Sequence, residues 1–167
     1  ISTTPATATR QDEVIVIDKY PGKAGAHTAN DVKVFRASEI YFIKAECLAR
    51  KSDFTGAADL IRQVRQARNY IVGAVVPAPV YTSIPQALAD ILTERRKELA
   101  FEGHRYIDLK RIGAEAGVTG TDRTTADAEN SSATNPANIL LGDYRFTLPI
   151  PQREININAL PQNVGYN

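Results

Sequence analysis

Three glutamates recur four residues apart in the stretch "ILTERRKELAFEGHRYIDLKR": Glu94, Glu98 and Glu102. On a helix this spacing places carboxylates on one face, roughly 6 Å apart, where like charges repel unless cations lie beside them. Such a row has three interpretations. It could be an acid–base active site, a metal site, or a set of ion pairs between packed helices.

The surrounding residues favour ion pairs. A glycosidase would need two carboxylates with separated pKa values across a substrate cleft, whereas a rich supply of arginine keeps carboxylates ionised. A di-iron bundle needs Glu-x-x-His, but the sequence here is Glu102-Gly103-His104. We therefore expect no catalytic residue, metal ligand or cofactor site. A hydrolase using Glu94 and Glu98 stays open as a third hypothesis. The cations available are Arg36, Arg62, Arg65, Arg68, Arg95, Arg96, Lys97, Arg105 and Arg111.

The other residues that could take part in catalysis or binding have no suitable partners at the required spacing in the sequence. Cys47 is the chain's single cysteine, so no internal disulfide can form, and its helical context predicts a small buried residue. His27 lies in a loop without acidic or thiol neighbours at ligand spacing, which predicts a solvated side chain. Tyr81, in a loop bounded by prolines, is the tyrosine that we expect to be exposed, and it is our one candidate for ligand binding.

Composition limits the class of protein. The chain of 167 residues carries 20 Lys and Arg against 19 Asp and Glu, a net charge of +1, which gives no electrostatic reason to expect nucleic acid. No apolar run approaches the ~20 residues of a membrane helix. Because the chain begins with Ile1, we expect a processed chain or part of a longer protein.

Helical periodicity dominates the central part of the chain. The first predicted helix spans 36–50, with Ile40, Ile43 and Cys47 on one apolar stripe. Asp53 is the expected N-cap of a second helix over 54–69, and so short a connection predicts an antiparallel αα-hairpin. Ser83 opens a third helix over 84–101 as a capping box, and Gly103 should end it. The predicted inner face of the second helix is Ala57, Leu60, Ile61, Val64 and Ala67.

The remaining segments predict irregular structure, so the fold class is mainly α with long loops and little β. Residues 1–35 read as an N-terminal extended or loop segment, 36–112 as the helical core, and 113–143 as a surface loop. Residues 144–167 should form an extended segment held to a core by apolar side chains among prolines. These side chains are Phe146, Leu148, Ile150 and Ile155.

Three stretches, taken in order, resemble the SusD/RagB family of outer-membrane nutrient-binding lipoproteins. The first is "VFRASEIYFIKAECLARKSDFTGAADLIRQVRQAR"; the second is the glutamate-rich stretch extended to "ILTERRKELAFEGHRYIDLKRIG"; the third is "FTLPIPQREININ" followed by "LPQNVGY". The second is similar to the most distinctive signature of the family. Departures are small: Arg62-Gln63 replaces the usual Asn, and Val164 stands where proline is usual. The likeness covers the C-terminal part of such proteins.

This resemblance implies a tetratricopeptide-like helical protein without enzymatic activity. Such a protein sits on a TonB-dependent, SusC-like outer-membrane transporter and binds oligosaccharides or other nutrients at the cell surface. A lipid anchor and more polypeptide would precede this chain. The motif residues carried over are interpreted as scaffold, and the alternative is a free-standing helical-repeat module that binds a protein partner. The scaffold residues are Arg36, Glu39, Glu94, Arg95, Glu98, Glu102, Arg105, Asp108 and Arg111.

Overall fold

The computed structural model describes residues 19–26, 29–121 and 138–166. The chain divides into two units, Ile1–Val34 and Phe35–Asn167, each described by itself. The apolar run at 14–17 and His27 lie outside the described residues. Within the first unit, Lys23 and Ala26 form an isolated antiparallel bridge, and Lys23 pairs with Asp31 at 2.8 Å.

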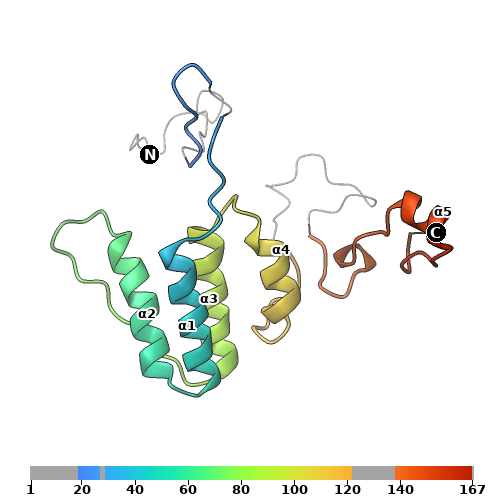
Figure 1. Ribbon diagram of the computed structural model, residues 1–167. Helices are drawn as coiled ribbons and strands as arrows, with labels where there is room; N and C mark the ends of the chain where they lie inside the picture. Colours follow the sequence, from blue (N-terminus) through green and yellow to red (C-terminus); the bar gives the residue numbers. More distant parts are fainter. Residues whose placement is uncertain (1–18, 27–28, 122–137, 167) are drawn as a thin grey trace, which may run out of the picture. The chain divides into compact units, whose positions relative to one another are not determined.

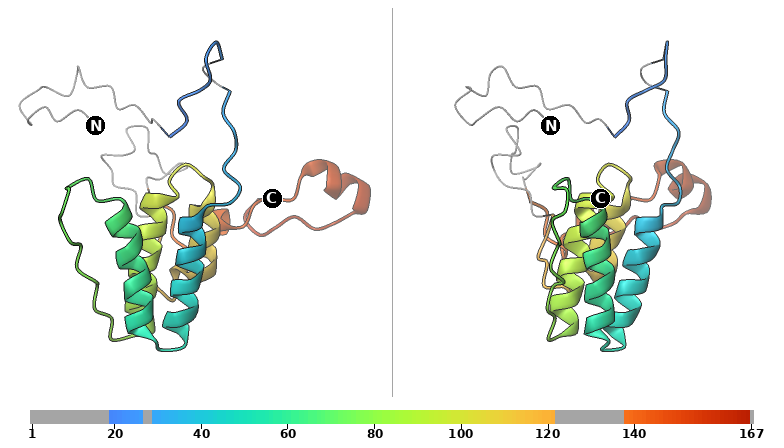
Figure 2. Two further views of the ribbon diagram at one scale, coloured as in Figure 1. Left: turned by 60° about the vertical axis from the view of Figure 1, so that its left-hand side comes forward. Right: turned by 90° about the vertical axis from the view of Figure 1, so that its left-hand side faces the viewer.

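The second unit is built on an αα-hairpin and a third helix. Helices α1 (Ala37–Arg50), α2 (Phe54–Ala67) and α3 (Ile84–Glu98) run side by side (Figures 1 and 2). Asp53 caps α2 as predicted, since its carboxylate accepts a hydrogen bond from the Gly56 amide at 2.9 Å. The described residues contain no strand, so the predicted mainly helical fold class is confirmed.

The capping box of α3 is realised in part. The Ser83 hydroxyl accepts from the Gln86 amide, as the box requires, but the Gln86 side chain accepts from the amide of Thr82 instead of that of Ser83. Both bonds satisfy backbone donors at the start of the helix, where no intrahelical partner exists.

The end of α3 differs from the prediction. The helix stops at Glu98, three residues before the expected end, and Gly103 is the N-cap of α4 (His104–Asp108). The Arg36 guanidinium donates to the Glu98 carbonyl at 2.9 Å, and Phe101 has a left-handed φ of 63°. A side chain from outside the helix therefore satisfies a carbonyl of its last turn. A π-helical turn, η1 (Leu109–Gly113), follows α4 directly.

Two apolar cores lie on either side of α3. The first joins α1, α2 and the Ala87 and Ile91 side of α3; the second joins Leu88 and Leu92 to α4, η1 and Phe146. No membrane-spanning helix occurs among the described residues, because none is long and apolar enough.

The predicted inner face of α2 is right except at Ala67, which is exposed, but that of α1 is wrong. The core side of α1 holds Phe42, Ala45 and Ala49, whereas Ile40, Ile43 and Cys47 point away from it. Cys47, expected to be buried, is therefore exposed. Helix α1 is apolar on both sides, so helical periodicity alone cannot tell which stripe meets the core.

The C-terminal segment also differs from the prediction. It forms a 3-10 turn, η3 (Tyr144–Phe146), and a short helix, α5 (Gln152–Asn158), where extended chain was expected. The carbonyl of Pro151, the N-cap residue of α5, accepts from Glu154 and Ile155 and starts that helix. Only Phe146 of the four predicted anchoring side chains is buried.

Candidate functional site

The carboxylate row, two members on α3 and Glu102 in the turn after it, is directed at arginines from the preceding hairpin and its N-cap. Glu98 accepts from Arg36 Nη2 at 2.5 Å and from Arg68 Nη2 at 2.6 Å, and its side chain is 8% exposed. The hydrogen bond from Arg68, aided by the charges of Arg68 and Arg36, lowers the pKa of Glu98 against the opposing effect of burial. A carboxyl held ionised in this way is a poor general acid.

Glu102 and Glu94 are also ion-paired. Glu102 accepts from Arg36 Nη1 at 2.5 Å, so one guanidinium joins two members of the row. Glu94 lies 3.0 Å from Arg65 of α2 and 2.8 Å from Lys97 of its own helix. The structure thus brings the whole row against cations.

The second part of the expected network ties α3 to α4. Arg95 donates through Nε to Asp108 at 2.7 Å, and both side chains are buried. Arg111 contacts Asp108 more loosely, at 3.7 Å, and makes its short contact of 2.6 Å with Glu46 of α1. Charges buried in this way are tolerated because each has a partner at hydrogen-bond distance.

Glu39 and Arg105 are the remaining residues of the predicted network. Glu39 lies 3.7 Å from His104 Nδ1 and is not placed against an arginine. Arg105 lies in α4 and lines a hollow beside Arg95 and Phe101.

Several partners in the network were not singled out from the sequence. Glu46 is buried in α1 and accepts from both Arg111 and Arg50; burial acts to raise the pKa of Glu46, but these hydrogen bonds outweigh it and lower the pKa. Asp90 of α3 contacts Arg65 at 2.6 Å. The four-residue spacing of Glu46 and Arg50 was a usable signal for their pair, but nothing in the sequence shows that Arg65 reaches Asp90.

Tyr81, the candidate for ligand binding, is buried where exposure was expected. It is 7% exposed and its hydroxyl donates to Asp90 at 2.6 Å. Burial, together with that hydrogen bond, raises the pKa of the Tyr81 hydroxyl. The expectation of exposure was wrong because the loop folds back over the first core, where the ring is buried and the hydroxyl still finds a polar partner.

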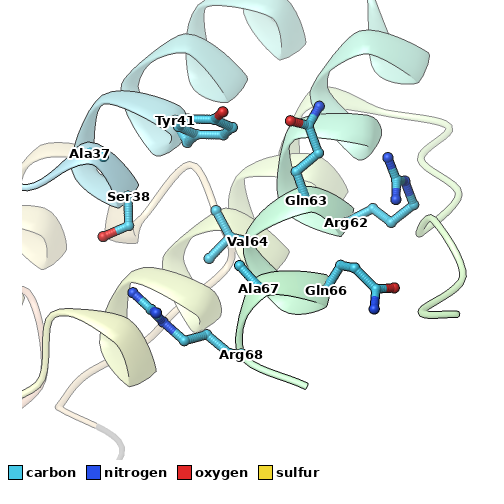
Figure 3. Close-up of a pocket in the computed structure, with 9 residues that line it drawn as sticks. All are labelled: Ala37, Ser38, Tyr41, Arg62, Gln63, Val64, Gln66, Ala67 and Arg68. Atoms are coloured by element: carbon cyan, nitrogen blue, oxygen red, sulfur yellow. The ribbon is translucent and has the colours of Figure 1, made fainter. Parts of the chain in front are cut away.

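A hollow of about 460 Å³ opens between α1 and α2 (Figure 3). Tyr41, which is 38% exposed, lies on the α1 side, and Val64 lies between the two helices. The polar side chains that line the hollow come mainly from α2. These side chains are Arg62, Gln63, Gln66 and Arg68.

The four polar side chains that α2 and its C-cap contribute to this hollow are already engaged within the chain, and the Ser38 hydroxyl of α1 also lines it. Arg62 and Gln63 both bond to Asp59, and Arg68 bonds to Glu98. Gln66 uses both ends of its amide on the following loop: it donates to the Ala74 carbonyl and accepts from the Val76 amide. What the hollow offers a ligand is therefore mainly apolar surface and the ring of Tyr41.

The described residues hold no group of three or more His, Cys, Asp or Glu side chains that could bind a metal ion. The pairing of the carboxylate row suits structural cross-linking of helices better than acid–base chemistry.

Comparison with known proteins gives consistent matches. A family model described as the SusD family matches residues 3–166. SusD-like protein P38 of Formosa agariphila is 33% identical over 115 residues, covering 66% of this chain and 23% of the relative. SusD-like protein P2 of the same organism is 29% identical over 148 residues, covering 87% of this chain and 28% of the relative. The chain thus spans about a quarter of the length of these curated relatives.

Solved structures agree. A SusD superfamily protein from Bacteroides thetaiotaomicron VPI-5482 superposes with a TM-score of 0.63 at 30% identity, over 88% of this chain and 31% of that one. A SusD superfamily protein from Bacteroides fragilis NCTC 9343 has a TM-score of 0.61 at 24% identity, which shows a shared fold. Because the family model covers nearly every residue, the chain belongs to the SusD family.

Proposed function

We propose that this chain is the C-terminal part of a non-enzymatic binding protein that captures glycans or related nutrients for a TonB-dependent, SusC-like outer-membrane transporter. The observation that carries the proposal is the match to the SusD family over residues 3–166. The longer protein would be held at the cell surface by a lipid anchor in its N-terminal part.

The ion-pair network supports a binding role over a catalytic one. Its central carboxylate, Glu98, bonds to two arginines and has a lowered pKa, so it cannot readily donate a proton to a glycosidic oxygen. We assign the network a bracing role: Arg36 and Arg68 hold the end of α3 to the hairpin, and Arg95 holds α3 to α4.

Binding and turnover can be tested together on the protein expressed from its complete gene. The purified protein is titrated calorimetrically with a panel of oligosaccharides, and the same mixtures are then analysed for products by chromatography. We expect heat of binding from at least one glycan class and no new product. Release of shorter sugars would contradict the proposal, and so would the absence of binding across the panel.

The complete gene and its neighbours provide an independent test. We expect an upstream region encoding a signal peptide, a lipobox cysteine and further helical pairs, beside a gene for a TonB-dependent transporter. An ordinary start codon directly before Ile1 would contradict the view that this chain is part of a longer protein.

A free-standing helical module that binds a protein partner is the second candidate. The outward apolar side chains of α1 favour it, because exposed apolar patches mark interaction sites. Sedimentation of the 167-residue chain distinguishes the two candidates. A stable monomer supports the module, whereas self-association or dependence on a companion polypeptide supports the longer protein.

A further inference from the structure

The ion pairs that join the helices use two kinds of cation, and one kind loses its charge near neutral pH. Arginine is the partner of Glu98, Asp108 and Glu46, and a guanidinium is effectively always charged in proteins. Glu39 of α1 is instead paired with His104, the first residue of α4. Because histidine gains or loses its proton between about pH 5 and 8, this pair can change with pH where the arginine pairs stay charged.

The surroundings of Glu39 make it dependent on this histidine. Its Oε1 atom lies 3.7 Å from His104 Nδ1, and the side chain of Glu39 is 19% exposed and that of His104 23% exposed. Among the described residues, no lysine or arginine forms an ion pair with Glu39. A carboxylate largely withdrawn from water is costly unless a cation accompanies it. The protonation state of His104 therefore decides whether Glu39 has a charged partner.

The other charges that face this pair are already matched. Both residues line the hollow of about 590 Å³ between α1 and α4. The other ionisable side chains that line it are Glu46 and Cys47 of α1, Arg95 of α3, Glu102 in the turn before α4, Asp108 of α4 and Arg111 of η1. Each of these three carboxylates accepts a hydrogen bond from an arginine. With Glu39, four carboxylates face two guanidinium groups, a balance that favours an imidazolium, whereas the dipole of α4 opposes a cation at its first residue.

We propose that His104 and Glu39 form a pH-sensitive connection between the first turn of α1 and the start of α4. With its proton, the imidazole is a cation that attracts the Glu39 carboxylate; without it, the ring is neutral and this attraction is lost. The stabilisation is complete at the acid end of the range and disappears as the pH rises and the imidazole loses its proton. The proposal concerns the helices of this chain and does not depend on the proposed ligand or transporter.

The start of α4 is the part of this unit that such a connection can hold or release. Helix α4 has five residues, too few for stability on its own, and no described side chain caps it. Its position therefore depends on side-chain contacts. Arg95 of α3 holds its last residue, Asp108, and Tyr106 donates to the Phe146 carbonyl. We expect loss of the charge on His104 to loosen the first residues of α4, while the Arg95–Asp108 pair keeps its end in place.

A double-mutant cycle at two pH values tests the proposal on the 167-residue chain. Glu39→Gln, His104→Gln and the combined variant are unfolded with urea at about pH 5.5 and about pH 8, where glutamates are ionised and histidine changes from charged to neutral. We expect the two substitutions to be coupled by roughly two- to fivefold in the unfolding equilibrium constant at the lower pH, and to be uncoupled at the higher pH. Equal coupling at both pH values, or none at either, would overturn the proposal.

The pair of Arg111 with Glu46 is a matched control in the same hollow. Its coupling, measured with Arg111→Gln, Glu46→Gln and the combined variant, should be the same at both pH values, because a guanidinium and a glutamate carboxylate stay charged over this range. A parallel change in both cycles would reflect a general effect of pH and would contradict the assignment to His104.

Hydrogen exchange followed by mass spectrometry gives a local readout that does not require equal stability of the variants. In the wild type, the amides of residues 99–106 should exchange more slowly than in Glu39→Gln at about pH 5.5, and this difference should disappear at about pH 8. Comparing the two proteins at one pH cancels the intrinsic pH dependence of exchange. A difference that is absent at the lower pH, or that persists unchanged at the higher pH, would rule out the proposed connection.

Discussion

Helices α1 and α2 are the same length and pack against each other, yet they differ in how they face water. Helix α2 buries Leu60, Ile61 and Val64, and its opposite side carries polar residues such as Asp59 and Gln63. Helix α1 buries one apolar side and exposes another. A helix that is apolar on one side is typical of a protein surface, whereas a helix that is apolar on both sides is typical of a position between two neighbours.

The largest expected effects lie on the buried sides, where the two helices should behave alike. Phe42→Ala in α1 should lower the free energy of unfolding by about 3–5 kcal/mol, because it leaves a cavity in a fully buried site. Ile61→Ala in α2 should cost about 2–5 kcal/mol for the same reason. Urea denaturation of the 167-residue chain measures both. A cost below about 1 kcal/mol at Phe42 would mean that this side of α1 is not the core side.

Breaking the ion pairs between arginines of the hairpin and α3 should have the next largest effect on the free energy of unfolding. Glu98→Gln removes the charge that Arg36 and Arg68 share, and should lower the free energy of unfolding by about 1–3 kcal/mol. Asp59→Asn, in the exposed pair with Arg62 on α2, is the matched control and should leave the free energy of unfolding nearly unchanged. Unchanged stability of Glu98→Gln together with loss of a wild-type hydrolytic activity would instead support the hydrolase hypothesis.

Lowering the pH should weaken the ion pairs that Glu98 and Glu46 make with arginines. The pKa values of Glu98 and Glu46 are both lowered in the folded chain, so their contribution to stability is complete above the unfolded pKa of about 4.3 and disappears as pH falls through the folded values. The free energy of unfolding should therefore be nearly level between about pH 7 and 5 and decline below about pH 4. Glu98→Gln should decline less steeply over that acid range. Identical acid profiles for the variant and the wild type would show that Glu98 contributes nothing to the decline.

The difference between α1 and α2 also explains which buried faces could be predicted from the sequence. In α2, apolar residues cluster on one stripe, so the buried face followed from periodicity alone, apart from Ala67 at the helix end. In α1, the stripe of Ile40, Ile43 and Cys47 has larger side chains than the alanines of the true core side. The core side combines these alanines with Phe42, and its burial follows from packing against α2 and α3, which the periodicity of a single helix does not encode.

The contacts of the site can likewise be separated into those that the sequence predicted and those that it did not. The excess of arginine near Glu94, Glu98 and Glu102 predicted that cations would lie beside the row. Individual partners depend on how helices distant in sequence are placed, which is why the contact of Arg65 with Asp90 was not foreseen. Burial of Tyr81 likewise depends on the path of its loop, which prolines restrict but do not determine.

The most direct measurement compares one substitution on the outward face of α1 in two lengths of the protein. Ile40→Gln should change the free energy of unfolding of the 167-residue chain by no more than about 0.5 kcal/mol, as expected of an exposed position. In the protein from the complete gene, where the further helical pairs of the proposed longer protein would cover Ile40, Ile43 and Cys47, it should cost about 2 kcal/mol or more. Equal small costs in both proteins would contradict the account, because they would show that the outward face of α1 stays in water.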